Sequence, residues 1–349
     1  MTIDWPALHS PDAFRNTRVL VTGGAGFIGS HLVDALIALK AHVTVLDDLS
    51  TGDAGNLAEA RDHAPDRLRL VEASILDAAA LADAARGARY VFHLAALASV
   101  PDSIERPAAY HEINATGTLH VLEAARACGV ERVIFAASSA AYGNADALPL
   151  AESIPPQPLS PYAASKLAGE ALLAAYAHSY EALDTVSLRY FNIFGPRQNA
   201  NSAYAAVIAA FAQALTSGQA PTIFGDGSQS RDFTYVANAV HANLLAARAP
   251  APLAGQVVNV ATGVRTTVNA LAEQMSPLMG RGGVAPRYAP ARTGDALHSV
   301  ADLARARALL GYEPVVDFPA GLKATAEWYA SLAPAPGGGP GGAVTGGDR

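Results

Sequence analysis

The sequence contains a single cysteine, Cys128, among its 349 residues. One cysteine cannot form a disulfide within the chain and cannot build a cysteine-rich zinc site, so we expect no metal centre. The scarcity of cysteine also suits a reducing compartment such as the cytoplasm.

Two further absences narrow the class of protein. No stretch approaches the ~20 apolar residues that a membrane-spanning helix needs, and the acidic, proline-containing start lacks the basic end and apolar core of a signal peptide. The net charge is −7, and the chain has no basic stripe of the kind that nucleic-acid-binding proteins carry. We therefore expect a soluble, cytoplasmic protein with no membrane and no nucleic-acid partner.

The first 190 residues alternate short β-rich runs with alanine-rich helical stretches. The predicted strands cover 18–22, 42–47, 68–72, 90–94, 132–137 and 185–190, and the predicted helices lie near 27–39, 78–85, 109–127 and 161–179. Such alternation predicts an α/β fold with a doubly wound parallel sheet of the Rossmann type. We assign residues 1–190 to this domain, which also receives segments from about 232–262. Residues 191–331 form mainly a smaller mixed α/β C-terminal lobe, and 332–349 a disordered Gly/Pro-rich tail.

Three glycines follow the first predicted strand, at the mouth of a helix. Gly23, Gly26 and Gly29 form a GxxGxxG pattern, in which the first permits a tight turn, the second lets a pyrophosphate approach and the third lets helix and strand pack closely. The start of the helix offers free N–H groups to phosphates. The pattern predicts a dinucleotide site, although a simple tight strand-to-helix connection would also explain it.

The ends of the second and fourth predicted strands support the assignment of a dinucleotide-binding site. The second strand closes with Asp47-Asp48, where a carboxylate accepts the adenosine ribose hydroxyls and repels a 2′-phosphate, so NAD is favoured over NADP. We assign the ribose to Asp47 and a loop-capping role to Asp48. The fourth strand ends in HLAA (93–96), whose small residues suit close passage of a cofactor. His93 by itself could equally be a packed imidazole.

A second set of residues indicates proton transfer. Tyr162 and Lys166 lie at i and i+4, on one face of a helix that Ser160-Pro161 starts. A tyrosine with a pKa of about 10 is a poor base at neutral pH, and a nearby ammonium favours its phenolate. Alone, the pair could be a surface tyrosine beside a solvated lysine. Ser138-Ser139 follow the strand that should end beside this helix, and they complete a Ser/Tyr/Lys set.

Six motifs in this order resemble the extended short-chain dehydrogenase/reductase family, specifically its nucleotide-sugar 4-epimerases: GGAGFIG, HLAA, SSAAYG, SPYAASK, RYFNIFGPRQ and GDGSQSRDF. The likeness runs from about Arg18 to Trp328. It implies NAD in the Rossmann lobe, a UDP-sugar in the smaller lobe, and a homodimer formed through the helices near 109–127 and 161–179.

The resemblance also implies roles for individual residues. Ser138 and Tyr162 would contact the reacting 4-hydroxyl, and Lys166 would hold the nicotinamide ribose. The implied cofactor-binding residues are Gly23, Gly26, Phe27, Ile28, Gly29, Asp47, Ile75, Leu94, Ala95, Ala96, Asn114, Tyr162, Lys166 and Tyr190. The implied substrate-binding residues are Ser99, Ser139, Asn192, Gln198, Ala206, Val207, Arg231, Arg292, Asp295 and Ser299.

The same resemblance narrows the reaction and the sugar. Related 4,6-dehydratases carry Asp-Glu directly after the catalytic Ser or Thr, whereas Ser139-Ala140 follow Ser138 here, so we expect a 4-epimerase acting through a 4-keto sugar. The alternatives are a dehydratase, a decarboxylase, a uronate epimerase, a net oxidoreductase and a non-catalytic NAD-binding protein. Small Ser299 favours N-acetylated UDP-hexosamines and also admits UDP-glucose. Ala98 and Ala140 depart from that subgroup's glycine and serine, and Ser74 replaces a frequent aspartate near the adenine.

Overall fold

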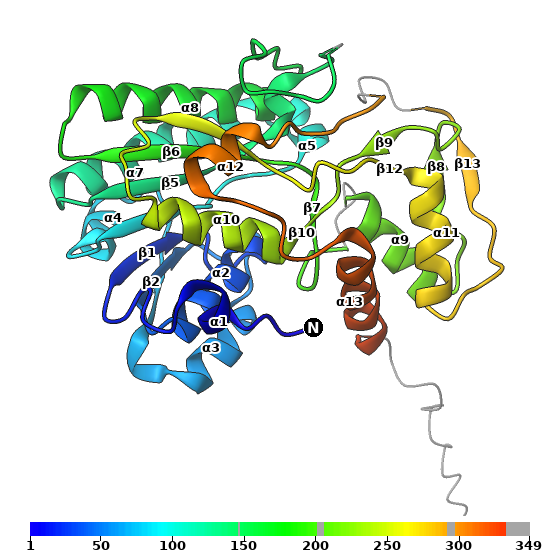
Figure 1. The fold of residues 1–349 in the computed structure, drawn as a ribbon, viewed down its shortest axis with the longest axis horizontal. Coiled ribbons are helices and arrows are strands. Elements are labelled where there is room, and N and C mark those ends of the chain that lie inside the picture. Colours follow the sequence, from blue (N-terminus) through cyan, green and yellow to red (C-terminus); the bar gives the residue numbers. More distant parts are fainter. Residues whose placement is uncertain (146, 201–205, 292–296, 333–349) are drawn as a thin grey trace, which may run out of the picture.

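A seven-stranded parallel sheet forms the centre of the protein (Figure 1). The computed structural model describes residues 1–145, 147–200, 206–291 and 297–332. The strands are β1 (Arg18–Thr22), β2 (His42–Asp47), β3 (Leu68–Glu72), β4 (Tyr90–His93), β5 (Arg132–Ser138), β6 (Asp184–Tyr190) and β11 (Gln256–Val260). Their order is β3-β2-β1-β4-β5-β6-β11. The predicted Rossmann-type α/β fold is confirmed, and the strand order reverses between β1 and β4, where ligands bind in such sheets.

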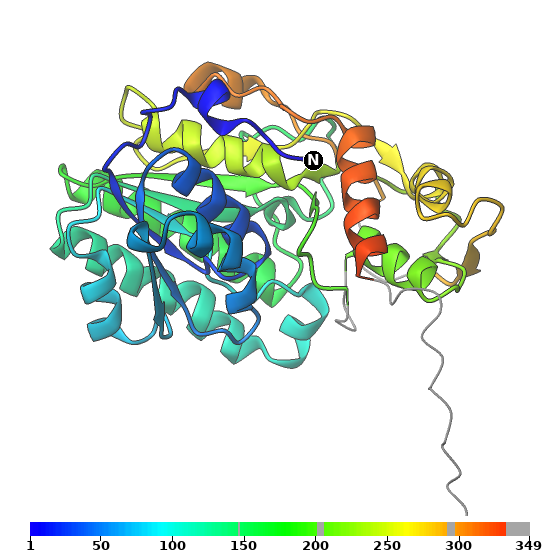
Figure 2. The same cartoon turned by 90° about the horizontal axis from the view of Figure 1, so that it is seen from below.

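Helices cover both faces of the sheet because side chains along a strand alternate between the faces. On β1, Val19 and Val21 pack into one apolar cluster and Leu20 into the other. The first cluster holds α2 (Phe27–Ala38) and α10 (Val236–Arg248), and the second holds α4 (Ala78–Ala85), α7 (Gly117–Ala127) and α8 (Pro161–Ser179). Figure 2 shows α1 (Trp5–His9) beside α10.

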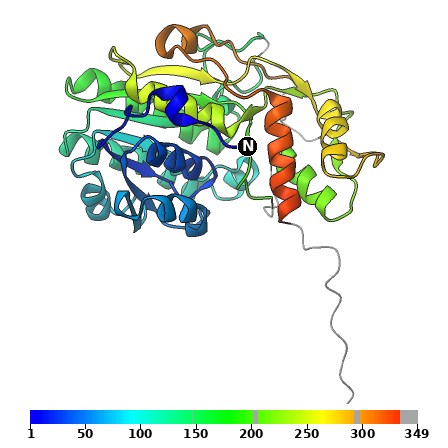
Figure 3. The ribbon, with the colours of Figure 1, turned by 60° about the horizontal axis from the view of Figure 1, so that its bottom comes forward.

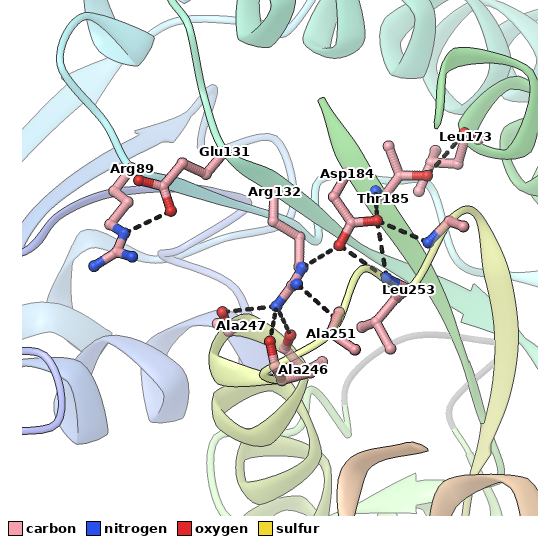
Figure 4. Close-up of polar contacts among 12 residues, drawn as sticks. Arg89, Glu131, Arg132, Leu173, Asp184, Thr185, Ala246, Ala247, Ala251 and Leu253 are labelled. Atoms are coloured by element: carbon pink, nitrogen blue, oxygen red, sulfur yellow. Dashed lines mark hydrogen bonds and ion pairs between the residues drawn. The ribbon is translucent and has the colours of Figure 1, made fainter. Parts of the chain in front are cut away.

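Arg132, at the start of β5, ties α10 to the sheet (Figure 4). Its guanidinium donates to the Asp184 carboxylate of β6 at 2.5 Å and to the carbonyls of Ala246 and Ala247 at 2.8 and 3.0 Å. A cation there satisfies the free carbonyls at the end of a helix and complements its dipole. Asp184 also accepts the N–H of Leu253, just before β11. These bonds bring a segment from the second half of the chain onto the sheet of the first half.

The smaller lobe lies beside the carboxyl ends of the strands (Figure 3). It contains α9 (Val207–Thr216), α11 (Val268–Leu278) and α13 (Phe318–Ser331). Three two-stranded pairs accompany them: β7 (Ile193–Phe194) with β10 (Thr234–Tyr235), β9 (Ser230–Arg231) with β12 (Thr266–Thr267), and β8 (Thr222–Phe224) with β13 (Arg287–Ala289). Before α13 in the chain, α12 (Ala304–Leu310) packs near β11.

Several short helices are absent from the sequence prediction. They are α1, α3 (Ala58–His63) and α5 (Val100–Glu105), each with fewer than two turns, which is too short for a periodic pattern. The predicted helix that follows them along the chain begins with another short helix, α6 (Pro107–His111). The helix predicted over 109–127 is in three pieces: α6, a π-helical turn η3 (Glu112–Thr116), and α7. In the described parts of the chain, no helix is long and apolar enough to cross a membrane.

Candidate active site

The turn between β1 and α2 depends on contacts that only glycine allows. Gly23 has a φ of +71°, and a Cβ there would lie 2.6 Å from the backbone nitrogen of Ala95. A Cβ on Gly29 would lie 2.1 Å from the carbonyl oxygen of Gly23. The first N–H groups of a helix have no partner inside it, and Gly26, which precedes α2, has no side chain to cap them. The turn therefore presents backbone donors to an anion.

Asp47 ends β2 and lies against the same turn. Its carboxylate accepts the N–H of Ala25 at 2.9 Å and the N–H of Leu49 at 3.0 Å. Burial raises the pKa of Asp47, and these backbone donors oppose the shift. Each carboxylate oxygen has a further lone pair for a ribose hydroxyl. Asp48 instead accepts hydrogen bonds from the backbone and the hydroxyl of Ser50, in agreement with its predicted loop-capping role.

His93 is a packed imidazole within a buried network. The Thr118 hydroxyl donates to the carbonyl of Asn114 at 2.6 Å, so Thr118 Oγ1 must accept the proton of His93 Nε2, 2.9 Å away. His93 Nδ1 then accepts from the Thr22 hydroxyl at 2.8 Å. Burial lowers the pKa of His93 to about 3, which keeps the ring neutral. The network fixes the end of β4, where Leu94, Ala95 and Ala96 follow.

The predicted Ser/Tyr/Lys set comes together at the carboxyl end of β5. Ser138 ends the strand and lies next to the half-buried phenol of Tyr162, whose pKa its hydroxyl lowers. Ser160 caps α8 by accepting the N–H of Ala163 at 3.1 Å, which sets the start of the helix that carries Tyr162. One turn later, the Lys166 ammonium donates to a backbone carbonyl of β5 at 2.8 Å. The structure therefore brings Ser138 to the helix face that carries Tyr162 and Lys166.

The electrostatics of the set are governed by burial. Burial raises the pKa of Tyr162, and the hydrogen bond from Ser138 opposes the shift. Burial lowers the pKa of Lys166 to about 7, opposed by the charge of Glu170. The ammonium also lies 4.8 Å from the centre of the Phe135 ring. The lysine alone thus does not hold Tyr162 as a phenolate here; a further positive charge near the phenol would act in that direction.

Two predicted cofactor residues have their polar groups engaged by the protein. The Asn114 amide binds both backbone groups of Leu97 at 2.9 Å and the hydroxyl of Ser165 at 2.9 Å. The Tyr190 hydroxyl accepts from Asn243 of α10 at 2.5 Å. Asn114 therefore joins the segment after β4 to the helix that carries Tyr162, a contact that its sequence position does not predict.

In the smaller lobe, Arg231 and Ser299 lie on neighbouring segments. The N–H of Ser299 donates to the carbonyl of Ser230 at 3.1 Å, next to Arg231 in β9. Asp232 is fully buried and accepts from Thr262, Gly263 and Ala301, which fixes the segment that carries the arginine. Both the hydroxyl of Ser299 and the amide oxygen of Gln198 are buried without a hydrogen-bond partner among the described residues.

The other predicted site residues have these places. Phe27 and Ile28 open α2, and Ile75 follows β3. Ser99 caps α5, and Ser139 begins η4 (Ser139–Tyr142). Asn192 donates to the carbonyl of Asp232 at 3.2 Å, and Ala206 and Val207 begin α9. Arg292 and Asp295 lie outside the described residues. Within the described residues, no group of three His, Cys, Asp or Glu side chains could hold a metal ion.

Comparison with known proteins identifies the family. The model of the NAD dependent epimerase/dehydratase family matches residues 19–261. The chain belongs to this family. It is 41% identical over 315 residues to a UDP-glucose 4-epimerase of Mycolicibacterium smegmatis, covering 89% of this chain and 98% of the relative.

Solved structures agree in fold and length. A UDP-N-acetylglucosamine 4-epimerase from Methanobrevibacter ruminantium M1, in complex with UDP-N-acetylmuramic acid, is 42% identical with a TM-score of 0.86, covering 91% of this chain and 99% of that one. A Thermus thermophilus UDP-glucose 4-epimerase in complex with NAD is 37% identical with a TM-score of 0.80, and the match covers 90% of this chain and 100% of that one.

The cofactor of this family member is NAD. The glycine turn fits it, because a Cβ at Gly23 or Gly29 would fill the cradle and because α2 begins with free backbone donors for the diphosphate. Asp47 lies against the same turn, where a carboxylate can accept the hydroxyls of a ribose.

Proposed function

We propose that this protein is a UDP-sugar 4-epimerase that interconverts UDP-GlcNAc and UDP-GalNAc, UDP-glucose and UDP-galactose, or both pairs. The placement of Ser138 beside the Tyr162 phenol, one helical turn from buried Lys166, carries the proposal. This arrangement supplies a hydroxyl donor and a phenol for one reacting oxygen. The 4-epimerases that are about 40% identical to this chain support the same activity.

In the proposed reaction, Tyr162 takes the proton of the sugar 4-hydroxyl while Ser138 donates a hydrogen bond to the same oxygen. NAD, when bound, supplies the hydride acceptor for C4 and its positive nicotinamide. That charge opposes the effect of burial on Tyr162, whose pKa is raised in this structure. After the 4-keto sugar turns in its pocket, C4 regains the hydride on its opposite face and Tyr162 returns the proton to the oxygen. The sugar undergoes no net oxidation.

The residues after Ser138 favour epimerisation over dehydration. Elimination of water needs a carboxyl group near the catalytic serine, and the resemblance places Asp-Glu there in dehydratases. Here η4 begins with Ser139 and Ala140, and the Ala140 N–H donates to Ser138 Oγ at 3.2 Å. Neither side chain can act as a carboxylic acid or carboxylate.

A product assay tests the proposal. Purified protein is incubated separately with UDP-GlcNAc and UDP-glucose, without added NAD, and the C4 epimers are resolved by chromatography. We expect at least one pair to approach equilibrium without NADH absorbance. If neither sugar gives its C4 epimer even with NAD supplied, the proposal is wrong; a 4-keto-6-deoxy product would identify a dehydratase.

A tyrosine variant with a matched control tests the base. Tyr162→Phe removes the only atom that Tyr162 contributes to proton transfer, and we expect turnover to fall about 10²- to 10⁴-fold. Tyr180→Phe deletes the same atom from an exposed tyrosine just after α8 and should leave turnover unchanged. Equal activity of the two variants would contradict the assignment.

Ser299 tests the choice of sugar. Its buried hydroxyl has no hydrogen-bond partner among the described residues, and the small side chain supports room for an N-acetyl group. Ser299→Tyr should lower kcat/KM for UDP-GlcNAc about 10- to 200-fold relative to UDP-glucose. An unchanged ratio between the sugars would show that another residue sets the choice.

A further inference from the structure

Tyr110, which sequence reasoning did not select, lies between two parts of the proposed site. It lies in the last turn of α6 and is 1% exposed. Its ring meets the Tyr162 ring edge to face, with centroids 6.3 Å apart and planes at 89°. Its hydroxyl accepts the N–H of Ser99 at 3.0 Å. One side chain thus touches both the proposed base and the turn that carries a predicted substrate residue.

The hydroxyl of Tyr110 also lies near the first turn of α5. Burial, followed by the effect of the Asp102 carboxylate, raises the pKa of Tyr110 to about 12. The side chain of Ser99 accepts the Asp102 N–H at 3.2 Å. The residue that caps α5 is therefore attached to the phenol oxygen of Tyr110, and loss of that oxygen leaves the Ser99 N–H without its partner.

We propose that Tyr110 is a positioning residue: its ring holds the Tyr162 phenol in place, and its hydroxyl holds the Ser99 turn against the sugar. The inference rests on the proposed epimerase function. An edge-to-face pair restrains the rotation of both rings, and a small displacement of a catalytic group lowers the rate steeply. The ring should therefore act on kcat, and the hydroxyl on KM.

Two variants separate these effects. Tyr110→Phe keeps the ring and removes the hydroxyl, so KM for the UDP-sugar should rise about 5- to 10-fold with kcat nearly unchanged. Tyr110→Leu also removes the ring, so kcat should fall about 10-fold in addition. Tyr312→Phe is the matched control, because the Tyr312 hydroxyl is equally buried and donates to the carbonyl of Ala261 at 2.9 Å.

Hydrogen exchange gives a readout that is independent of activity. The Ser99 amide should exchange about 10-fold faster in Tyr110→Phe than in the wild type or Tyr312→Phe. Equal exchange in all three proteins would overturn the inference, whether or not the wild type is an epimerase. Tyr110 variants that change kcat and KM no more than Tyr312→Phe, at equal loss of thermal stability, would also overturn it. A wild type inactive on both sugars contradicts the proposed function instead.

Discussion

The ion pair between Glu170 and Arg189 offers a quantitative test of the buried core beside the site. Glu170 lies on α8, one turn after Lys166, and Arg189 lies on β6. The carboxylate accepts two hydrogen bonds from the guanidinium, at 2.8 and 2.7 Å, and the side chains are 4% and 3% exposed. Burial lowers the pKa of Arg189, but the bonds and charge of Glu170 outweigh it, so the guanidinium stays charged.

Glu170→Gln removes the negative charge and keeps the shape. Loss of one partner from a buried pair costs about 3–5 kcal/mol, because the other charge remains buried and uncompensated. The amide oxygen can still accept one of the two bonds, so we expect a loss of about 3 kcal/mol in the free energy of unfolding. Urea denaturation with NAD-saturated protein measures it as a lower midpoint at unchanged slope.

A surface pair provides the control. Arg307 and Glu313 form the same kind of contact, at 2.7 Å, with side chains that are 54% and 63% exposed. Glu313→Gln should therefore give no resolvable loss of stability. If Glu170→Gln costs no more than Glu313→Gln, the buried pair does not compensate the Arg189 charge and the reasoning is refuted. A Glu170→Met/Arg189→Met double variant should be more stable than Glu170→Gln.

Three further predictions concern the cofactor and pH. Gly29→Ala should abolish NAD copurification, since its Cβ would clash with backbone. Gly282→Ala, with no atom within 4 Å of its Cβ and no left-handed backbone conformation, should retain NAD. Arg197→Met removes the ion pair with Asp34 of α2, the helix whose first N–H groups are free for the diphosphate of NAD. NAD release should therefore become about 10-fold faster, as measured by trapping the released NAD. Burial lowers the pKa of His9 and His241 to about 4. As pH drops, the histidines of the unfolded chain take up protons before those of the folded protein do, so the free energy of unfolding should fall between about pH 6.5 and pH 4. In thermal unfolding, the melting temperature of a His9→Phe/His241→Phe variant should depend less on pH over this range.

The sequence predicts the parts of the site that depend on local spacing. Gly23 and Gly29 share one turn, and Tyr162 and Lys166 share one helix face, so their geometry follows from a few consecutive residues. Ser138 joins them because parallel strands end at the same edge of the sheet. The fold class follows in the same way from alternating strands and helices.

The contacts made by Tyr110 and by Asn114 depend on packing between distant segments. The resemblance implies that Asn114 binds the cofactor, yet its amide binds Leu97 and Ser165, 17 and 51 residues away. Tyr110 is an aromatic residue on a short helix, a pattern typical of a core residue in any fold. Only its ring contact with Tyr162, 52 residues later in the chain, distinguishes it.

The pair of Glu170 and Arg189 also reaches the proposed chemistry through Lys166. Burial lowers the pKa of Lys166 to about 7, and the charge of Glu170 opposes this shift. Glu170→Gln should therefore lower the pKa of Lys166 further. At a given pH above about 6, less of the lysine is then in its ammonium form in the variant than in the wild type. A neutral amine gives the Tyr162 phenolate less support, and the loss of kcat/KM in the variant should grow as pH rises. The assay measures kcat/KM of Glu170→Gln and of Glu313→Gln from pH 6 to 9. If the two pH profiles are parallel, the Glu170 carboxylate acts on stability alone.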